Sequence, residues 1–218
     1  MKQFKEISRL IKNLTQKRDH YSGSAHYYQL TVFDRYTNLK SLMRVFCDSQ
    51  SSHSFTTTEN IKFKGSIEFS TPESQVIKTL GNPIVYFENP ELQNHSILFY
   101  KCFIGNFKTN LELHFYDEKF FMGVYSFNRI KGNADKNKIK NILYEKYKVT
   151  GEAGKDDDLV IVDKNSNTVM ISDHINYSYI YISGNDEILA ELKSNIDHII
   201  SIVKNKEKRI ERYIAVNL

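Results

Sequence analysis

From residue 84 to residue 127 apolar and polar side chains alternate along the chain, and many of the apolar ones are Phe or Tyr. A period of two is typical of strands, and here it predicts four of them, at 84–87, 95–104, 111–116 and 120–127. The turns between them are short, and short connections make neighbouring strands antiparallel. This stretch is therefore predicted to be an antiparallel β-meander.

A short helix is predicted immediately before the meander. Ser70 with Glu73 three residues later has the spacing of a capping box, and Gly81 followed by Pro83 is a stop signal. Between these signals three apolar residues recur at helical spacing and predict the buried stripe: Val76, Ile77 and Leu80.

A similar order of elements follows, with a helix at 135–148 and strands at 159–163, 169–173 and 177–183. The chain then closes with a long helix from residue 186, whose apolar residues alternate at spacings of three and four: Leu189, Leu192, Ile196, Ile199 and Val203. We therefore predict an α+β fold of antiparallel β-meanders with helices packed on one face, arranged as two helix-plus-meander units and ending in a long C-terminal helix.

Three parts follow from this order. An N-terminal helical portion spans 1–55 and includes a basic amphipathic helix at 3–18. A helix with a four-stranded antiparallel meander spans 61–130. A helix, a three-stranded meander and the long C-terminal helix span 134–218.

The string STPESQVIKTLGNP at residues 70–83, with its meander, resembles a module of two protein families. These are the small outer-membrane assembly lipoproteins and the β-lactamase inhibitor proteins, which often show a Ser or Thr, an acidic residue, a Val and then Leu-Gly-x-Pro before a sheet. The resemblance covers about residues 65–128. It implies a protein that binds other proteins and does not catalyse a reaction.

Net charge and local motifs argue against several classes of function. The 218 residues carry a formal net charge of +4, too small a bias to indicate nucleic-acid binding. The first twenty residues are charged every few positions and no apolar stretch approaches a membrane span, so we expect a soluble, cytoplasmic protein that does not bind membranes. No nucleotide-binding loop or paired-histidine metal motif occurs, and we expect no metal and no cofactor.

The string DKNSN at 163–167 imitates the first half of a calcium-binding loop. Thr168 and His174 stand where that loop needs Gly and Glu, so we interpret the string as a hairpin turn.

One strand carries a candidate catalytic face. Alternation in 111–116 places Glu112, His114 and Tyr116 together, and these groups could support acid–base chemistry if their pKa values were tuned. The competing interpretation is an ordinary polar face on the exposed side of an antiparallel sheet.

A second strand carries an aromatic stripe made of Tyr177, Tyr179 and Tyr181. Tyr suits protein interfaces, because it joins a flat apolar body to a hydroxyl group, so these residues are the candidate partner-binding surface. The competing interpretation places this face under the closing helix.

The leading functional hypothesis is a non-enzymatic protein-binding module of inhibitor, immunity, anti-defence or assembly-factor type, from a bacterium or phage. Residues 189–203 also indicate a homodimer through the C-terminal helix. One alternative is an enzyme that uses the Glu112 face. The other is a binding protein for a small apolar ligand, with a pocket between the meander and the C-terminal helix lined by Phe99, Phe103, Leu113 and Phe115.

Overall fold

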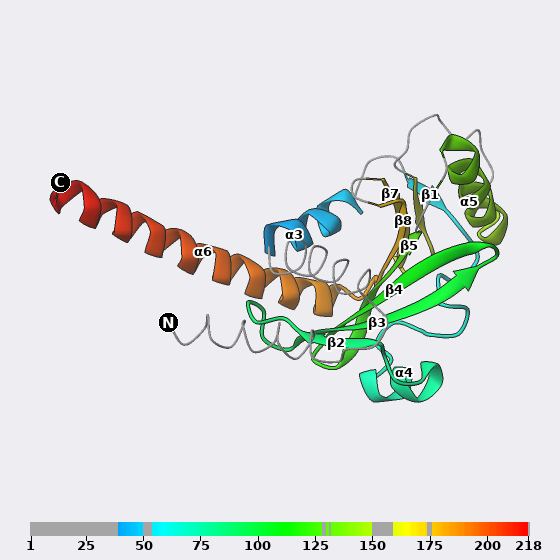
Figure 1. Cartoon of the computed structure of the whole chain (residues 1–218), viewed down its shortest axis with the longest axis horizontal. Coiled ribbons are helices and arrows are strands. Elements are labelled where there is room, and N and C mark those ends of the chain that lie inside the picture. The colour runs from blue at the N-terminus through cyan, green and yellow to red at the C-terminus, as the bar shows by residue number, and fades with distance from the viewer. Residues whose placement is uncertain are drawn as a thin grey trace.

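The computed structural model describes residues 39–49, 54–127, 130, 132–149, 159–173 and 176–217. Within them one eight-stranded sheet is combined with four helices (Figure 1), which are α3 (Leu39–Asp48), α4 (Glu73–Leu80), α5 (Asn133–Lys146) and α6 (Asp186–Asn217). The predicted α+β class and the long C-terminal helix are confirmed. The helix predicted at 3–18 lies outside the described residues.

The strands run in the spatial order β1-β6-β7-β8-β5-β4-β3-β2. Every neighbouring pair is antiparallel except β1 and β6, which are parallel, so the sheet is mixed. Their bounds are β1 (Ser54–Thr56), β2 (Val85–Glu88), β3 (His95–Ile104), β4 (Phe107–Tyr116), β5 (Lys119–Phe127), β6 (Val160–Val162), β7 (Thr168–Ser172) and β8 (Ser178–Ile182).

The pairing of β5 with β8 joins the strands of the two predicted units, 61–130 and 134–218. Its antiparallel register runs from Met122 opposite Ile182 to Ser126 opposite Ser178. Strands that are more than 50 residues apart in sequence therefore share one continuous hydrogen-bonded ladder. The two helix-plus-meander segments contribute to a single sheet.

Helices cover both faces of this sheet, where the sequence pattern indicated one. The segment before α4, α4 itself and α5 pack on one face, which we call the α5 face. Helices α3 and α6 pack on the other, which we call the α6 face. The physical reason is that the central strands carry large apolar residues at successive positions, such as Ile97 and Leu98, and both sides must then leave water.

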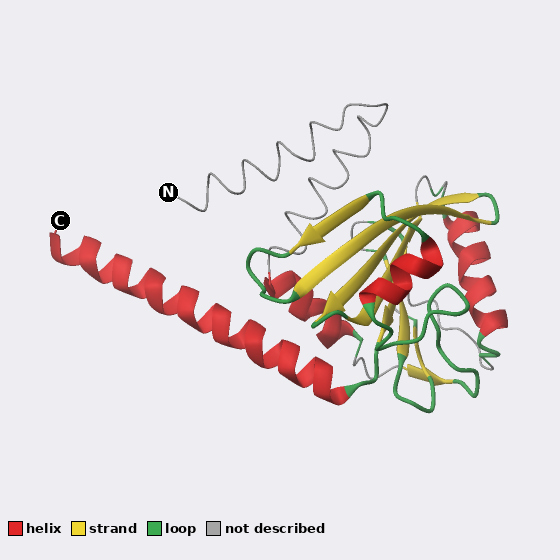
Figure 2. Ribbon diagram, turned by 90° about the horizontal axis from the view of Figure 1, so that it is seen from below, coloured by secondary structure: helices red, strands yellow, loops and turns green. Residues whose placement is uncertain are grey.

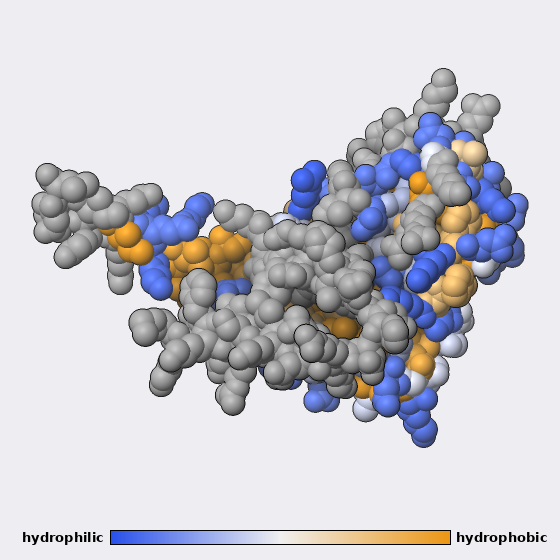
Figure 3. Space-filling view, in the orientation of Figure 1, coloured by the Kyte–Doolittle hydropathy of each residue, from blue (hydrophilic) through white to orange (hydrophobic). Residues whose placement is uncertain are grey.

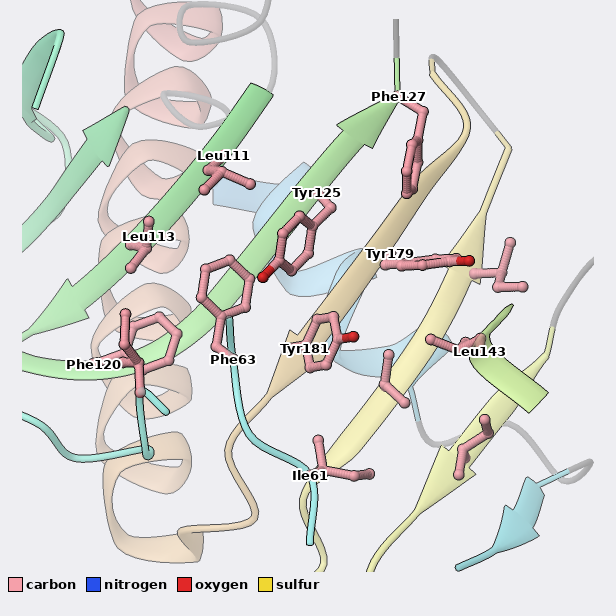
Figure 4. Close-up of a cluster of buried hydrophobic side chains, with 14 of the residues drawn as sticks. Ile61, Phe63, Leu111, Leu113, Phe120, Tyr125, Phe127, Leu143, Tyr179 and Tyr181 are labelled. Carbon is pink, nitrogen blue, oxygen red and sulfur yellow. The ribbon is translucent and has the colours of Figure 1, made fainter. Parts of the chain in front are cut away.

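The α5 face is dominated by aromatic rings (Figure 4). Phe63, from the segment before α4, is fully buried and its ring centroid lies 4.5 Å from that of Tyr125 and 5.5 Å from that of Tyr181. Gly123 makes this possible, because a Cβ atom there would lie 2.5 Å from the Phe63 ring.

Helix α4 begins at Glu73, two residues later than a capping box at Ser70 predicts, and that capping box does not form. Ser70 has a positive φ of 65°, and its backbone N–H donates to the carbonyl of Phe120. The chain before α4 is thus tied to β5, and Glu73 instead accepts a hydrogen bond from the Ser96 hydroxyl on β3. The helix stop at Gly81 is confirmed, with its N–H bonded to the carbonyl of Ile77.

Helix α6 has 32 residues and only its first part packs on the sheet. There it buries Ile188, Leu192 and Ile196 on the α6 face. The rest continues away from the sheet as one uninterrupted helix (Figures 1 and 2). None of the described helices is both long enough and apolar enough to cross a membrane.

Candidate functional site

The three tyrosines predicted as a partner-binding surface lie together, as expected, but in the core. Tyr177, Tyr179 and Tyr181 are 6%, 4% and 3% exposed, and all three point to the α5 face. The Tyr177 hydroxyl donates to the carbonyl of Lys136 at 3.3 Å, and that of Tyr179 donates to the carbonyl of Ile139. Their aromatic stripe therefore holds α5 and is not open to a partner in this structure. The helix above it is α5, and the closing helix α6 lies on the opposite face.

The four residues predicted to line an apolar pocket do not meet. Leu113 and Phe115 are buried on the α5 face, whereas Phe99 is buried on the α6 face. Phe103 lies near the end of β3 and is 72% exposed. The β3–β4 register explains the separation, because it sets Phe99 opposite Glu112, one position away from Leu113.

The candidate catalytic strand residues do share a face, and that face is buried. Glu112, His114 and Tyr116 lie on the side of the sheet that carries α3 and α6, with exposures of 0%, 0% and 3%. Nε2 of His114 lies 3.9 Å from Oε2 of Glu112. The Tyr116 hydroxyl accepts a hydrogen bond from Asn195 of α6, so it serves to attach that helix. The exposed polar face expected from strand alternation is thus an interior one.

A histidine that sequence reasoning missed completes this group. Nε2 of His95 lies 3.1 Å from Nδ1 of His114, and the two rings stack with an interplanar angle of 17°. Nδ1 of His95 lies 3.0 Å from the amide nitrogen of Asn89. The amide orientation is set by the backbone N–H of Glu91, which donates to Oδ1 of Asn89 at 3.0 Å.

These contacts assign the proton positions. Burial, and to a lesser extent the charge of His114, hold the pKa of His95 well below its ordinary value of 6.5, so this ring is neutral near pH 7. The Asn89 amide donates to Nδ1 of His95. The proton of the neutral His95 ring is therefore on Nε2, and this Nε2–H donates to Nδ1 of His114. Both ring nitrogens of His95 are occupied by protein groups, so the ring forms part of an internal chain of hydrogen bonds.

A β-bulge shapes the same place. The β4–β5 register shifts between His114 and Phe115, and Phe121 is the extra residue on β5. Its ring lies 5.9 Å from that of His95 and 6.1 Å from that of His114. The bulge thus places an aromatic ring beside the histidine pair and contributes to its burial.

A polar cleft of about 720 Å³ lies above His95, between β2, the β4–β5 turn and the start of α4. The described residues that line it include no Lys or Arg, but they include four carboxylates, those of Glu73, Glu88, Asp117 and Glu118. Asp117 and Glu118 both have positive φ, as the paired central residues of a tight hairpin turn do. The described residues hold no group of three or more His, Cys, Asp or Glu side chains arranged as a metal site.

The projecting part of α6 carries the other unusual surface. Val203 and Ile210 are 47% and 51% exposed, and Ile202 beside them is 53% exposed. Val203 follows the partly buried Ile199 by four residues and precedes Ile210 by seven, so the buried apolar stripe of α6 continues beyond the sheet. Hydrophobic side chains are visible along this part of the helix in Figure 3. We call residues 201–217 the outer half of α6 and residues 186–200 the inner half.

Comparison with family models, curated proteins and solved structures gives no match to this chain. The resemblance of residues 65–128 to small outer-membrane assembly lipoproteins and β-lactamase inhibitor proteins therefore stays a prediction.

Proposed function

We propose that this protein is a non-enzymatic protein-binding module whose contact surface is the outer half of α6. The observation that carries the proposal is that the apolar stripe of α6 continues through Val203 and Ile210. Both side chains are exposed, because this part of the helix extends beyond the sheet. We retain the hypothesis that the protein binds a partner. The proposed contact surface is now this helix and no longer the buried tyrosines.

The energetic argument is that an exposed apolar stripe gains from being covered. Burying one Val or Ile side chain contributes about 1.5–3 kcal/mol. Most of the stability of a helix in a protein comes from packing of its amphipathic face, so docking would also stabilise the outer half itself. An amphipathic helix laid into an apolar groove is a recurrent mode of protein recognition. The setting we propose is a cytoplasmic inhibitor, immunity, anti-defence or assembly-factor protein of a bacterium or phage.

The test is affinity capture by the full-length protein from a lysate of its own cells, followed by mass spectrometry. Wild type and three variants are compared: Val203→Glu, Ile210→Glu and Ile142→Glu. Ile142 on α5 is the matched control, because it is 42% exposed on a helix of the body. We expect a stoichiometric partner with wild type and Ile142→Glu, and at least about a tenfold loss with either α6 variant.

Equal capture by all four proteins would contradict the proposal, because binding would then not use α6. Loss of the partner with Ile142→Glu alone would also contradict it and would direct attention to α5. Circular dichroism of each variant establishes that the sheet is intact.

A second candidate function is binding of a small cationic ligand in the cleft. Four carboxylates and no Lys or Arg are found among the described residues that line it, so the proposed ligand is a cation and not the apolar molecule that the sequence predicted. Spermidine is a suitable probe. It should raise the thermal midpoint of wild type, and the double variant Glu88→Gln/Glu118→Gln should lose most of that rise; an undiminished rise in the variant would exclude the cleft.

A further inference from the structure

The outer edge of β2 is a surface that the proposed function does not use. Strand β2 is the last in the spatial order, and of the described strands it pairs with β3 alone (Figure 1). An edge strand presents backbone N–H and C=O groups with which another chain can pair. We propose that this edge binds an extended, lysine- or arginine-rich segment of another protein as an additional strand of the sheet.

The register of β2 on β3 identifies the outward backbone groups. The N–H of Asn89 donates to the carbonyl of His95 at 2.9 Å, so these two residues form a hydrogen-bonded pair. Hydrogen-bonded and non-hydrogen-bonded pairs alternate along an antiparallel ladder, and the next bonded position on β2 is therefore Phe87. The N–H and C=O groups of Tyr86 and Glu88 accordingly point away from β3, toward an incoming strand.

This edge lacks the protection that edge strands usually have. Lysines and prolines commonly block such edges, but no Lys or Arg occurs in 84–89, and Pro83 and Pro90 stand just outside that range. Ile84 and Tyr86 are 47% and 45% exposed, so an added strand would also cover apolar surface. The range between the two prolines matches an added strand of about five or six residues.

The charge of the incoming strand follows from the cleft beside this edge. Five residues that line it make it acidic or place β2 within it: Glu73, Tyr86, Glu88, Asp117 and Glu118. Burial and the carboxylates of Glu73 and Glu88 raise the pKa of Tyr86, so the potential beside the strand is negative.

Strand geometry directs alternate side chains of the incoming segment to this cleft. Residues that lie directly opposite Tyr86 and Glu88 would point to the same side of the sheet as those two side chains. Basic residues at these alternate positions would lie close to the carboxylates and to the ring of Tyr86, which also favours a cation. The segment that fits is therefore one in which basic residues recur at every second position.

A second copy of this chain is the competing occupant, since two β2 edges could pair with each other. That pairing would bring Glu88 and the acidic cleft of each copy close together, and like charges oppose it. A basic segment uses the same backbone groups with complementary charge. Charge therefore favours a basic partner over self-association.

Binding of a short peptide tests the proposal. The probe is a fluorescein-labelled peptide of about six residues in which lysine and valine alternate, and the matched control peptide has glutamate in place of each lysine. Fluorescence anisotropy with the full chain measures the dissociation constant of each. We expect the basic peptide to bind at least about tenfold more tightly than the acidic one at low salt, and added salt should weaken its binding.

Variants of β2 separate backbone pairing from charge. Tyr86→Pro removes an outward N–H without removing a bond to β3, and an edge strand tolerates proline at such a position. It should remain folded by circular dichroism and bind the basic peptide at least about tenfold more weakly, whereas Tyr86→Phe should bind it like wild type. Glu88→Lys should also lose at least about tenfold, whereas Glu145→Lys, the same charge change at an exposed position of α5, should not.

Modified peptides make the same test on the wild-type protein, so it does not depend on the folding of a variant. In the proposed pairing the lysine residues of the probe direct their N–H groups to β2. Methylation of the backbone nitrogen of each lysine should therefore abolish binding. Methylation of the valine nitrogens should leave it unchanged.

Three outcomes would overturn the inference. No binding of the basic peptide up to about 1 mM excludes the edge as its site. Undiminished binding to Tyr86→Pro, or of the peptide methylated at its lysines, excludes strand addition and leaves only attraction to the cleft. A wild-type dimer in sedimentation equilibrium that Tyr86→Pro dissociates would assign the edge to a second copy.

This inference goes beyond the proposed function and fails separately from it. Val203→Glu/Ile210→Glu should leave peptide binding unchanged, and Tyr86→Pro should leave partner capture through α6 unchanged. Spermidine forms no strand, so its effect on the thermal midpoint should persist in Tyr86→Pro. A spermidine effect without peptide binding would retain the small-ligand candidate and discard strand addition.

Discussion

At the residue scale, Asp163 shows how one carboxylate can hold two segments of chain. Its Oδ1 accepts the backbone N–H groups of Asn165 and Asn167 at 2.8 and 2.9 Å, which closes the β6–β7 turn. Its Oδ2 accepts the N–H of Ile61 at 2.8 Å, from the segment before α4. The string predicted as a hairpin turn is confirmed as one, and the carboxylate is used for hydrogen bonds.

Replacing Asp163 by Ala should therefore destabilise the fold. We expect the free energy of unfolding to fall by about 2–4 kcal/mol, since three backbone N–H groups lose a charged acceptor. Lys164→Ala, at the exposed neighbouring position, should change it by less than about 0.5 kcal/mol. Urea denaturation measures both values, and a loss below about 1 kcal/mol for Asp163→Ala would mean that water replaces the carboxylate.

The histidine pair predicts a pH dependence of stability. The folded-state pKa of His95 lies well below its ordinary value of 6.5, mainly through burial, so below pH 6.5 the unfolded state takes up a proton that the folded state does not. Stability should be fully present above pH 6.5 and decline as the pH falls below it. For one proton the slope approaches about 1.4 kcal/mol per pH unit.

The measurement is urea denaturation between pH 7.5 and 5. His95→Gln should reduce the slope, and His198→Gln, which removes an exposed histidine of α6, should retain it. A slope that His95→Gln does not alter would assign the pH dependence to other groups.

At the element scale, a short helix can be held by hydrogen bonds from strand side chains together with a few apolar contacts. Helix α5 buries Ile139 and Leu143, and it accepts hydrogen bonds at its carbonyls from the hydroxyls of Tyr177, just before β8, and Tyr179, on β8. The tyrosines therefore fulfil a structural role that requires both their rings and their hydroxyls.

Two adjacent residues of α5 should differ sharply on truncation. Leu143 is 1% exposed, so Leu143→Ala should cost about 2–5 kcal/mol of unfolding free energy. Ile142 is 42% exposed, so Ile142→Ala should cost less than about 0.5 kcal/mol. Thermal or urea unfolding checks this pair, and similar losses at both positions would mean that α5 packs through a different face.

At the scale of the whole molecule, the β5–β8 ladder makes the sheet a single body. Segments 61–130 and 134–218 each contribute strands, and neither has its full set of sheet neighbours without the other. Tyr125, Phe127, Tyr179 and Tyr181 also interlock across this ladder, with ring centroids of Phe127 and Tyr179 4.9 Å apart.

Unfolding should accordingly be one cooperative transition. We expect far-ultraviolet circular dichroism and tyrosine fluorescence to give coincident urea curves. A fragment of residues 61–130 should lack a cooperative transition, because β5 would expose its edge and its Tyr125 face. Two separated transitions, or an independently folded fragment, would contradict this and establish two domains.

What the sequence determined by itself was local. The alternation over 95–104 and 111–116 identified β3 and most of β4, and the stop at Gly81 ended α4, because periodicity and backbone conformation are set by nearby residues. It also determined that Glu112 and His114 share a face, as do Tyr177, Tyr179 and Tyr181. The position of His95 next to this face also follows from local sequence. The two-residue Gly-Asn loop sets Ile104 opposite Phe107 and hence His95 opposite Tyr116.

Only the tertiary structure decided what covers each face. Phe99 and Leu113 separate because strand register assigns them to opposite sides, and a shift of one residue would have exchanged those sides. The tyrosine stripe is covered by α5 because β8 pairs with β5, a contact between residues far apart in sequence. The exposure of Val203 and Ile210 depends on where the sheet ends beneath α6. A periodic pattern marks a helix face as apolar, but the position of the surface that covers it is a property of the assembled fold.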